Sequence, residues 1–213
     1  MTTEKMNVHK ALSELKVLSN RIVNALANDF VVANKHSNDK INGISIVNFN
    51  NDMKSHYQQV NDLIERRNAL KRAVVSNNAV TKVTVGGTEY TVAEAIEMKN
   101  NGMEFYKMLR DELARQYTKA EAKINMNSGK SLEERAEKYI VSILSSKNDA
   151  KIDTKLIDEL RAKYIENNTY DMLDPNNVRS GIETLNEMIE NFESDIDSAL
   201  SVSNAVTIIE FEY

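Results

Sequence analysis

The sequence predicts a mainly α-helical protein, in which a bundle of long helices or a coiled coil carries a small β-hairpin and a C-terminal strand. Apolar residues recur at alternating steps of three and four over long stretches, which places them on one side of a helix. Only one Pro and six Gly occur in 213 residues, so little interrupts these stretches. Charged residues make up 28% of the chain and the mean hydropathy is -0.48, which suits helices with one buried stripe and a solvated remainder.

The first helix is expected from about Glu4 to Ala27. Its apolar positions are Val8, Ala11, Leu15, Leu18, Ile22 and Ala25. The periodicity then changes, because short β-branched runs flanked by Asn occupy the region from Asp29 to Phe49, which favours a strand or an extended loop. A second amphipathic helix is expected from about Asn51 to Ser76.

A β-hairpin is expected after this second helix. The stretch "VTVGGTEYTV" places β-branched residues on both sides of Gly86-Gly87, and a Gly-Gly pair supplies the positive φ angles of a two-residue turn. Thr91 and Glu94 then match a capping box, which starts the next helix. The hairpin is therefore expected to reverse the chain between two long helices and to cover their ends.

The third helix is expected from about Val92 to Met126. Ser131 and Glu134 match a second capping box, which opens a shorter helix to about Ser145, and another short helix is expected from Asp153 to Asn167. We expect residues 128–170 to form an inserted subdomain of short helices. Residues 1–127 and 171–213 are expected to form the helical core with the hairpin and the terminal strand.

The last helix has the most regular apolar pattern, and Asp174 and Pro175 provide its start signal. The ending "VTIIEFEY" alternates apolar and charged residues, as a strand with one apolar face does. A narrow apolar stripe and a lone strand gain little burial by themselves, so we expect both to contact other chains, and the strand to pair between chains rather than within one. The candidate interaction residues are Val178, Ile182, Leu185, Ile189, Phe192 and Ile196 of the helix, and Ile209, Phe211 and Tyr213 of the strand.

The composition argues against several classes of protein. A net charge of -5 disfavours binding to nucleic acids or to anionic membranes, which both require a basic surface. The chain contains no Cys, which excludes disulfides and thiolate chemistry. The first residues show no secretory signal pattern, and no apolar run is long enough to span a bilayer, so synthesis in the cytoplasm without export is expected.

We find no catalytic or metal-binding pattern in the sequence, and we expect neither an enzyme nor a cofactor. His9, His36 and His56 lie far apart in the sequence, which favours solvated surface positions over metal ligands. The paired carboxylates Glu133/Glu134 and Glu210/Glu212 lie at a helix start and on a strand face, where no concave pocket is predicted between them.

The order of these elements resembles the small bacterial and phage family labelled septicolysin-like. The stretches that carry the resemblance are "ALSELKVLSNRI" (11–22), "VNDLIERRNAL" (60–70), "VGGTEYTVAEAI" (85–96), "LRDEL" (109–113) and "NAVTIIEF" (204–211). Residues 29–50 and 127–170 depart from the family pattern and look like insertions. The resemblance implies a helical protein of a type found among phage and prophage genes, and it brings no catalytic residues.

These observations lead to the expectation of a non-enzymatic structural protein, as a bacteriophage virion component of the head, neck, tail or baseplate. It would act through helix packing and inter-chain strand pairing, with itself and other virion proteins as partners, as a homo-oligomer or part of a large assembly. The first alternative is a cytosolic coiled-coil adaptor. The second is a membrane-active protein, as the cytolysin label of the family implies.

Overall fold

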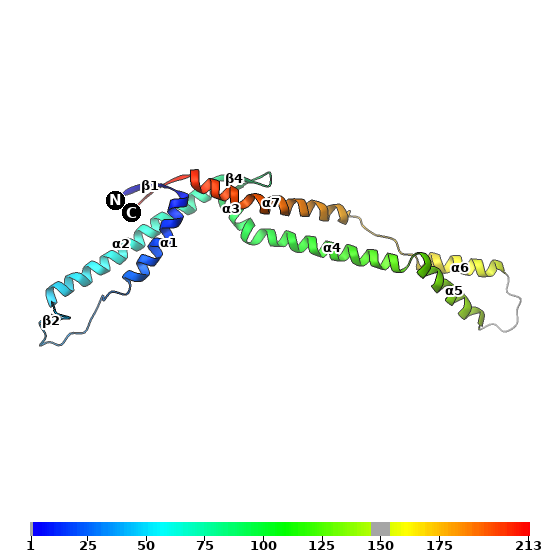
Figure 1. Cartoon of the computed structure of the whole chain (residues 1–213), viewed down its shortest axis with the longest axis horizontal. Helices are drawn as coiled ribbons and strands as arrows, with labels where there is room; N and C mark the ends of the chain where they lie inside the picture. The colour runs from blue at the N-terminus through cyan, green and yellow to red at the C-terminus, as the bar shows by residue number, and fades with distance from the viewer. Residues whose placement is uncertain (1, 146–153) are drawn as a thin grey trace. The chain divides into compact units, whose positions relative to one another are not determined.

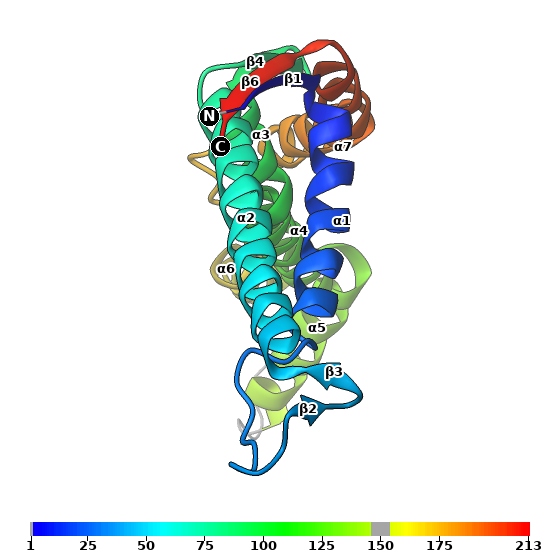
Figure 2. The same ribbon diagram turned by 90° about the vertical axis from the view of Figure 1, so that its left-hand side faces the viewer.

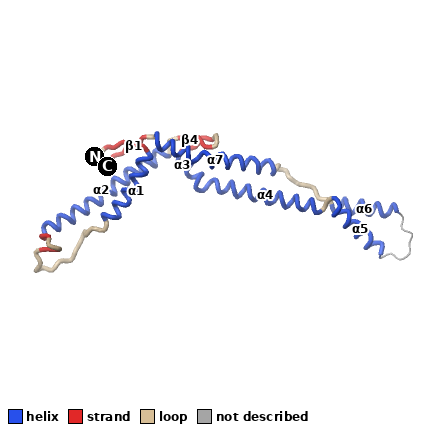
Figure 3. Tube along the Cα trace, in the orientation of Figure 1, coloured by secondary structure: helices blue, strands red, loops and turns tan. Residues whose placement is uncertain are grey.

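Helices make up most of the structure. The computed structural model describes residues 2–145 and 154–213; it is 72% helical, and its strands form small antiparallel pairs (Figures 1 and 3). This confirms the expected fold class. The chain divides into a first unit, residues 1–102 with 191–213, and a second unit, residues 103–190. The boundaries expected at residues 128 and 170 both fall inside the second unit.

The first unit begins with a strand, β1 (Thr3–Asn7), that leads directly into helix α1 (Val8–Ala25). We expected helix from Glu4, and this start is wrong by four residues. Asn7 ends the strand and caps the helix, because its side-chain oxygen accepts a hydrogen bond of 2.8 Å from the backbone N–H of Lys10. Asn is among the residues most favoured at this position, since it satisfies an amide that the helix leaves unpaired.

The C-terminal strand β6 (Ile208–Glu212) pairs antiparallel with β1, so that Met6 lies opposite Ile209 and Glu4 opposite Phe211 (Figure 2). We expected this strand to pair between chains rather than within one, and the structure corrects that expectation. The physical reason is the alternation of β6, which turns Ile209 and Phe211 into a core that the chain itself provides, while Ile208 stays exposed.

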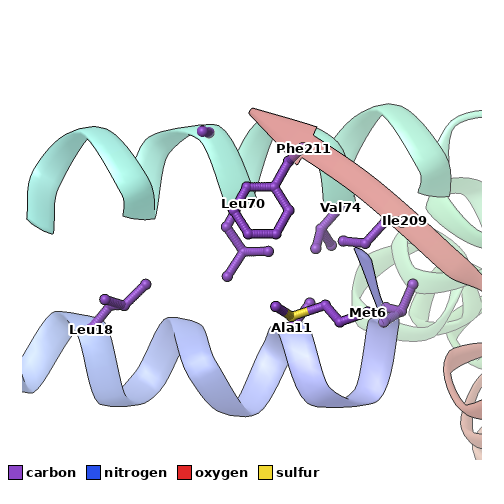
Figure 4. Close-up of a cluster of buried hydrophobic side chains, with 9 residues drawn as sticks. Met6, Ala11, Leu18, Leu70, Val74, Ile209 and Phe211 are labelled. Atoms are coloured by element: carbon purple, nitrogen blue, oxygen red, sulfur yellow. The ribbon is translucent and has the colours of Figure 1, made fainter. Parts of the chain in front are cut away.

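The core of the first unit lies between α1, the long helix α2 (Ile46–Asn78) and the β1–β6 pair (Figure 4). Phe211 points from β6 toward Leu70 of α2, and Met6 of β1 lies near Ala11 of α1. The buried members of this cluster are Met6, Val8, Ala11, Leu18, Ala69, Leu70, Val74, Ile209 and Phe211. The two chain ends thus close a core that the two helices alone would leave open on one side.

The segment between α1 and α2 contains little regular structure. Its strands, β2 (Lys40–Ile41) and β3 (Ile44–Ser45), form a minimal hairpin. Ser45 then caps α2, accepting a hydrogen bond of 3.3 Å from the backbone of Asn48. The expectation of strand or extended loop up to Phe49 therefore holds only as far as Ser45, because this cap starts the helix earlier.

The second hairpin, β4 (Lys82–Val85) and β5 (Thr88–Thr91), confirms the turn predicted at Gly86-Gly87. Helix α3 (Val92–Glu97) begins at the predicted capping box, in which Thr91 and Glu94 bond to each other's backbone amides. The chain then passes through a π-helical turn, η1 (Met98–Gly102), into α4 (Met103–Met126). One continuous helix was expected here; the wider turn interrupts its register.

Gly86 packs against the helix α7 (Val178–Val206). It has a φ of +56°, and a Cβ atom at this position would lie 3.2 Å from the backbone nitrogen of Phe192. Gly86→Ala should therefore lower the free energy of unfolding by about 1–3 kcal/mol, through backbone strain and displacement of the helix. Gly87→Ala is the matched control in urea unfolding, because Gly87 also has a positive φ but no atom within 4 Å of a built Cβ. Equal losses for both variants would contradict the contact with α7.

The second unit contains α4, α5 (Gly129–Ser145), α6 (Thr154–Asn168) and the first part of α7. Helices α5 and α6 pack together: the rings of Tyr139 and Tyr164 lie 4.8 Å apart, and Arg161 donates to Glu137 at 2.8 Å. Few side chains are buried; among the described residues of this unit they are Met103, Leu132, Ala136, Ile140 and Ile189.

Two predicted helix starts in this unit are displaced. Helix α5 begins at Gly129, so Ser131 lies inside the first turn and its hydroxyl donates to the carbonyl of Met126 instead of capping. Asp174 accepts from the backbone N–H of Val178 at 2.8 Å, and α7 begins at that residue rather than at Pro175. The start of α6 expected at Asp153 lies outside the described residues.

Candidate interaction site

The structure places most of the nine predicted interaction residues inside the chain. Ile189, Phe192 and Ile196 of α7 are buried, as are Ile209 and Phe211 of β6. Val178, Ile182, Leu185 and Tyr213 are half-buried. The apolar surface of the buried five is thus already covered without a second chain. The sequence pattern identified apolar stripes, but a stripe that covers its own core has the same spacing as one that binds a partner.

Arg66 of α2 joins this helix to β1, to α1 and to Tyr213, which follows β6. Its guanidinium donates to both carboxylate oxygens of Glu4 on β1, at 2.6 and 2.8 Å, and to Glu14 on α1, at 2.5 Å. It also contacts the Tyr213 hydroxyl and lies 4.6 Å from the centre of that ring, while the hydroxyl donates to Glu4 at 2.7 Å. Two carboxylates therefore share one cation in a partly buried, bidentate arrangement, which is stronger than a simple surface pair. No local pattern in the sequence predicts this cluster, because its bonded residues are 52 to 209 positions apart.

These contacts shift the titration of the groups involved. The hydrogen bonds from Arg66, and to a smaller extent the one from Tyr213, hold the pKa of Glu4 below its ordinary value of 4.5. The hydrogen bond to Glu4, together with burial, raises the pKa of the Tyr213 hydroxyl. At neutral pH, Arg66 and Glu4 are therefore charged and Tyr213 keeps its proton. The cluster holds the two chain ends on α2 and has no free donor set for a ligand.

The stability of the first unit should fall in acid because of Glu4. The pKa of Glu4 is lower in the folded than in the unfolded state, so at pH values between the two the unfolded state binds more protons. The stabilisation is complete above the ordinary value near 4.5 and is lost as the pH falls through the folded pKa. Urea unfolding from pH 7 to pH 3 should show this loss in the wild type and a smaller loss for Glu4→Gln. Parallel curves for the two proteins would exclude this role of Glu4.

The β4–β5 hairpin is attached to the C-terminal part of α7. The backbone N–H of Gly86 donates to the carboxylate of Asp195 at 3.1 Å, and Tyr90 meets Phe192 edge-to-face with ring centres 6.0 Å apart. Lys99 of the π-helical turn pairs with Asp197 of the same helix. The glycine turn therefore serves packing within the first unit.

Among the exposed apolar side chains, we distinguish two sets that lie on helix surfaces. We define the α1–α2 face as Leu12 and Val23 of α1 with Tyr57, Ile64 and Val75 of α2, which are all exposed. We define the α4 ridge as Phe105, Met108 and Leu109, of which Phe105 is 70% exposed and Met108 59% exposed. In the sequence, Met108 and Leu109 follow Phe105 by three and four residues, which places the three side chains next to one another on a helix. This short pattern lies beside the main apolar stripe of α4 and was not predicted to be a site.

The described residues were searched for metal-binding and catalytic groups. They contain no cluster of three or more His, Asp or Glu side chains suited to a metal ion. His9 and His36 are exposed, whereas His56 is half-buried and its Nδ1 atom has no hydrogen-bond partner, which differs from the surface position expected for it. It lines an open cavity of about 250 Å³ near the end of α1, together with Asp29 and Asp52. Among the described helices, none has the length and apolar character needed to cross a bilayer.

Comparison of the chain with family models, with curated proteins and with solved structures finds no match.

Proposed function

We propose that this chain is a non-enzymatic structural protein that assembles with further copies and with other proteins through its helices, as a component of a bacteriophage virion. The observation that carries the proposal is the amount of exposed surface. The chain exposes 15250 Å², whereas two separate, close-packed globules of the sizes of its two units would expose about 12,000 Å². This excess includes exposed apolar side chains on α1, α2 and α4, which contacts with further proteins would cover.

The kind of surface supports the same proposal. Exposed apolar residues recur along α1, α2 and α4, and apolar patches of this kind mark sites of protein association. The strongly bonded polar groups, by contrast, serve the fold: Arg66, Glu4 and Tyr213 join the chain ends to α2, and Thr91 and Glu94 cap α3. Assembly through helix faces, rather than through β6, agrees with the pairing of β6 to β1.

The resemblance to the septicolysin-like family directs the proposal toward phage particles. Antibodies against the purified chain should label intact particles produced by the cell or prophage that encodes it, and mass spectrometry of gradient-purified particles should recover its peptides in a fixed ratio to the capsid protein. Recovery only in the soluble host fraction would favour the cytosolic adaptor instead.

A direct measurement of association tests the proposal in solution. Sedimentation velocity over a hundred-fold range of concentration should show a mass that rises with concentration, because the apolar surfaces are exposed in the monomer. A membrane-active protein would instead release dye from anionic and neutral vesicles, and we expect no release. Vesicle leakage together with a constant monomeric mass would overturn the proposal.

A further inference from the structure

The α1–α2 face lies opposite the Arg66 cluster. In an α-helix, residues nine positions apart lie half a turn apart around the axis, and residues two apart nearly so. On α2, Tyr57 and Val75 are both nine residues from Arg66. On α1, Val23 is nine residues from Glu14, which is bonded to Arg66. The face is therefore on the side of the two helices that faces away from Arg66 and its contacts with Glu4 of β1 and Glu14 of α1.

Helix geometry also brings the two halves of this face together. Helices α1 and α2 run antiparallel (Figure 2). Because Glu14 is level with Arg66, Val23 is expected to lie level with Tyr57, nine residues away along each helix. These two side chains are 67% and 62% exposed. Leu12 and Ile64 extend the face toward the β1–β6 end. Two neighbouring helices thus present apolar side chains on the same side, as in half of a four-helix bundle.

The charges around this face are positive. Lys16 lies two residues from Glu14, and Lys71 lies seven residues from Ile64, so both are on the same side as the apolar residues, and both are exposed. Residues 1–82 contain twelve Lys or Arg but seven Asp or Glu, in a chain whose net charge is -5. Two copies of this face would place lysines against lysines, and the face therefore favours an apolar partner with acidic flanks.

The α4 ridge has this chemistry. Phe105, Met108 and Leu109 are spaced as the anchors of a helix that lies in a groove. Glu104 is exposed beside them, and Glu112 follows one turn later, where hydrogen bonds from Arg115 and Gln116 lower its pKa to about 2 and keep it ionised. Aromatic residues and Met are enriched at the centres of protein interfaces, while a ridge paired with itself would bring Glu112 near its own copy.

We propose that the α4 ridge of one copy packs into the α1–α2 face of a second copy. Phe105, Met108 and Leu109 pack on the exposed apolar side chains of the face, and Glu104 and Glu112 lie toward Lys16 and Lys71. The contact joins two different surfaces, so a pair of bound copies still has one free ridge and one free face, and the assembly grows to a filament or closes into a ring. This inference deepens the proposed function, on which it rests, by naming the partner as a second copy and the surfaces that meet.

Charge substitutions in the full-length chain test each surface separately. Tyr57→Glu places a charge in the face and Phe105→Glu places one in the ridge, and both residues are exposed. Because Tyr57 also meets Phe30 edge-to-face, with ring centres 6.3 Å apart, circular dichroism and melting first establish that the fold is unchanged. Each variant alone should associate at least tenfold more weakly than the wild type in sedimentation velocity. Val17→Glu on α1 and Val141→Glu on α5 are matched controls, because both valines are exposed outside the two surfaces, and both variants should associate as the wild type does.

Mixing the two variants gives the decisive result. The Tyr57→Glu chain keeps its ridge and the Phe105→Glu chain keeps its face, so the mixture should form dimers of one copy of each and nothing larger. A chain that carries both Lys16→Glu and Lys71→Glu should associate more weakly than the wild type. Mixing it with a second chain that carries Glu104→Lys should partly restore association.

Three other outcomes would overturn the inference. Association that is lost with only one of the two variants indicates a symmetric contact, and association insensitive to both indicates other surfaces. These two results leave the proposed structural function standing. A wild-type chain that stays monomeric at every concentration also overturns the inference, and its absence from purified particles would remove the proposed function as well.

Discussion

Deletion of residues 207–213 should unfold the first unit, with a large loss of helical signal and of cooperative melting. The deletion removes β6, which supplies Ile209 and Phe211 to the core and pairs along the whole length of β1. It also removes the Tyr213 hydroxyl from the Arg66 cluster. The loss of Phe211 alone should cost about 3–5 kcal/mol, which is a large part of the stability of a typical domain.

Single substitutions separate the two faces of β6 in this experiment. Phe211→Ala should lower the melting temperature strongly, whereas Ile208→Ala should leave it nearly unchanged, because Ile208 is 68% exposed on the opposite face of the strand. Circular dichroism during urea unfolding measures both effects. A truncated chain that melts like the wild type would mean that β6 does not belong to this core.

Ile189→Asp should lower the free energy of unfolding by roughly 3–5 kcal/mol, since it places an unpaired carboxylate at a buried site. Ile189 is 3% exposed on α7, within the second unit, which buries few other side chains. Loss of this one residue should therefore affect that unit strongly.

The control for this substitution is Ser198→Asp, which adds the same charge at an exposed position of the same helix. It should change the unfolding free energy by no more than about 0.5 kcal/mol. The apolar spacing of α7 would be irrelevant to stability if the two aspartates had equal effects.

The parts of the fold that were predictable from sequence are those with local causes. The hairpin follows from Gly86-Gly87, and the start of α3 from Thr91 and Glu94, because each needs only a few neighbouring residues. The stripe of α7 was also recognisable, and its central residues are buried. The strand that pairs with β6 could not be recognised from sequence. The stretch "TEKMN" looks like the start of a helix, and it is a strand because it pairs with residues 208–212.

The candidate sites show the same limit. Arg66 lies in a basic stretch of a predicted helix, "RRNALKR" (66–72). Nothing near it in the sequence indicates that Glu4, Glu14 and Tyr213 contact it. The α1–α2 face depends on two helices lying side by side, so neither helix reveals it alone. Conversely, the predicted interaction residues Phe192 and Phe211 are apolar because the chain buries them itself.

The pairing of the two chain ends has a consequence for the order of folding during synthesis. Glu4 and Tyr213, which are joined by a hydrogen bond, are separated by 209 positions. Residues 3–7 leave the ribosome early, but their strand has no partner until residues 208–212 have emerged. Until then α1 and α2 can pair as a hairpin with one side of their core open to solvent, while the second unit is completed first. Closure of such a long loop is slow compared with helix formation. Residues 208–212, which are translated after the whole second unit, therefore determine when α1 and α2 reach their final stability.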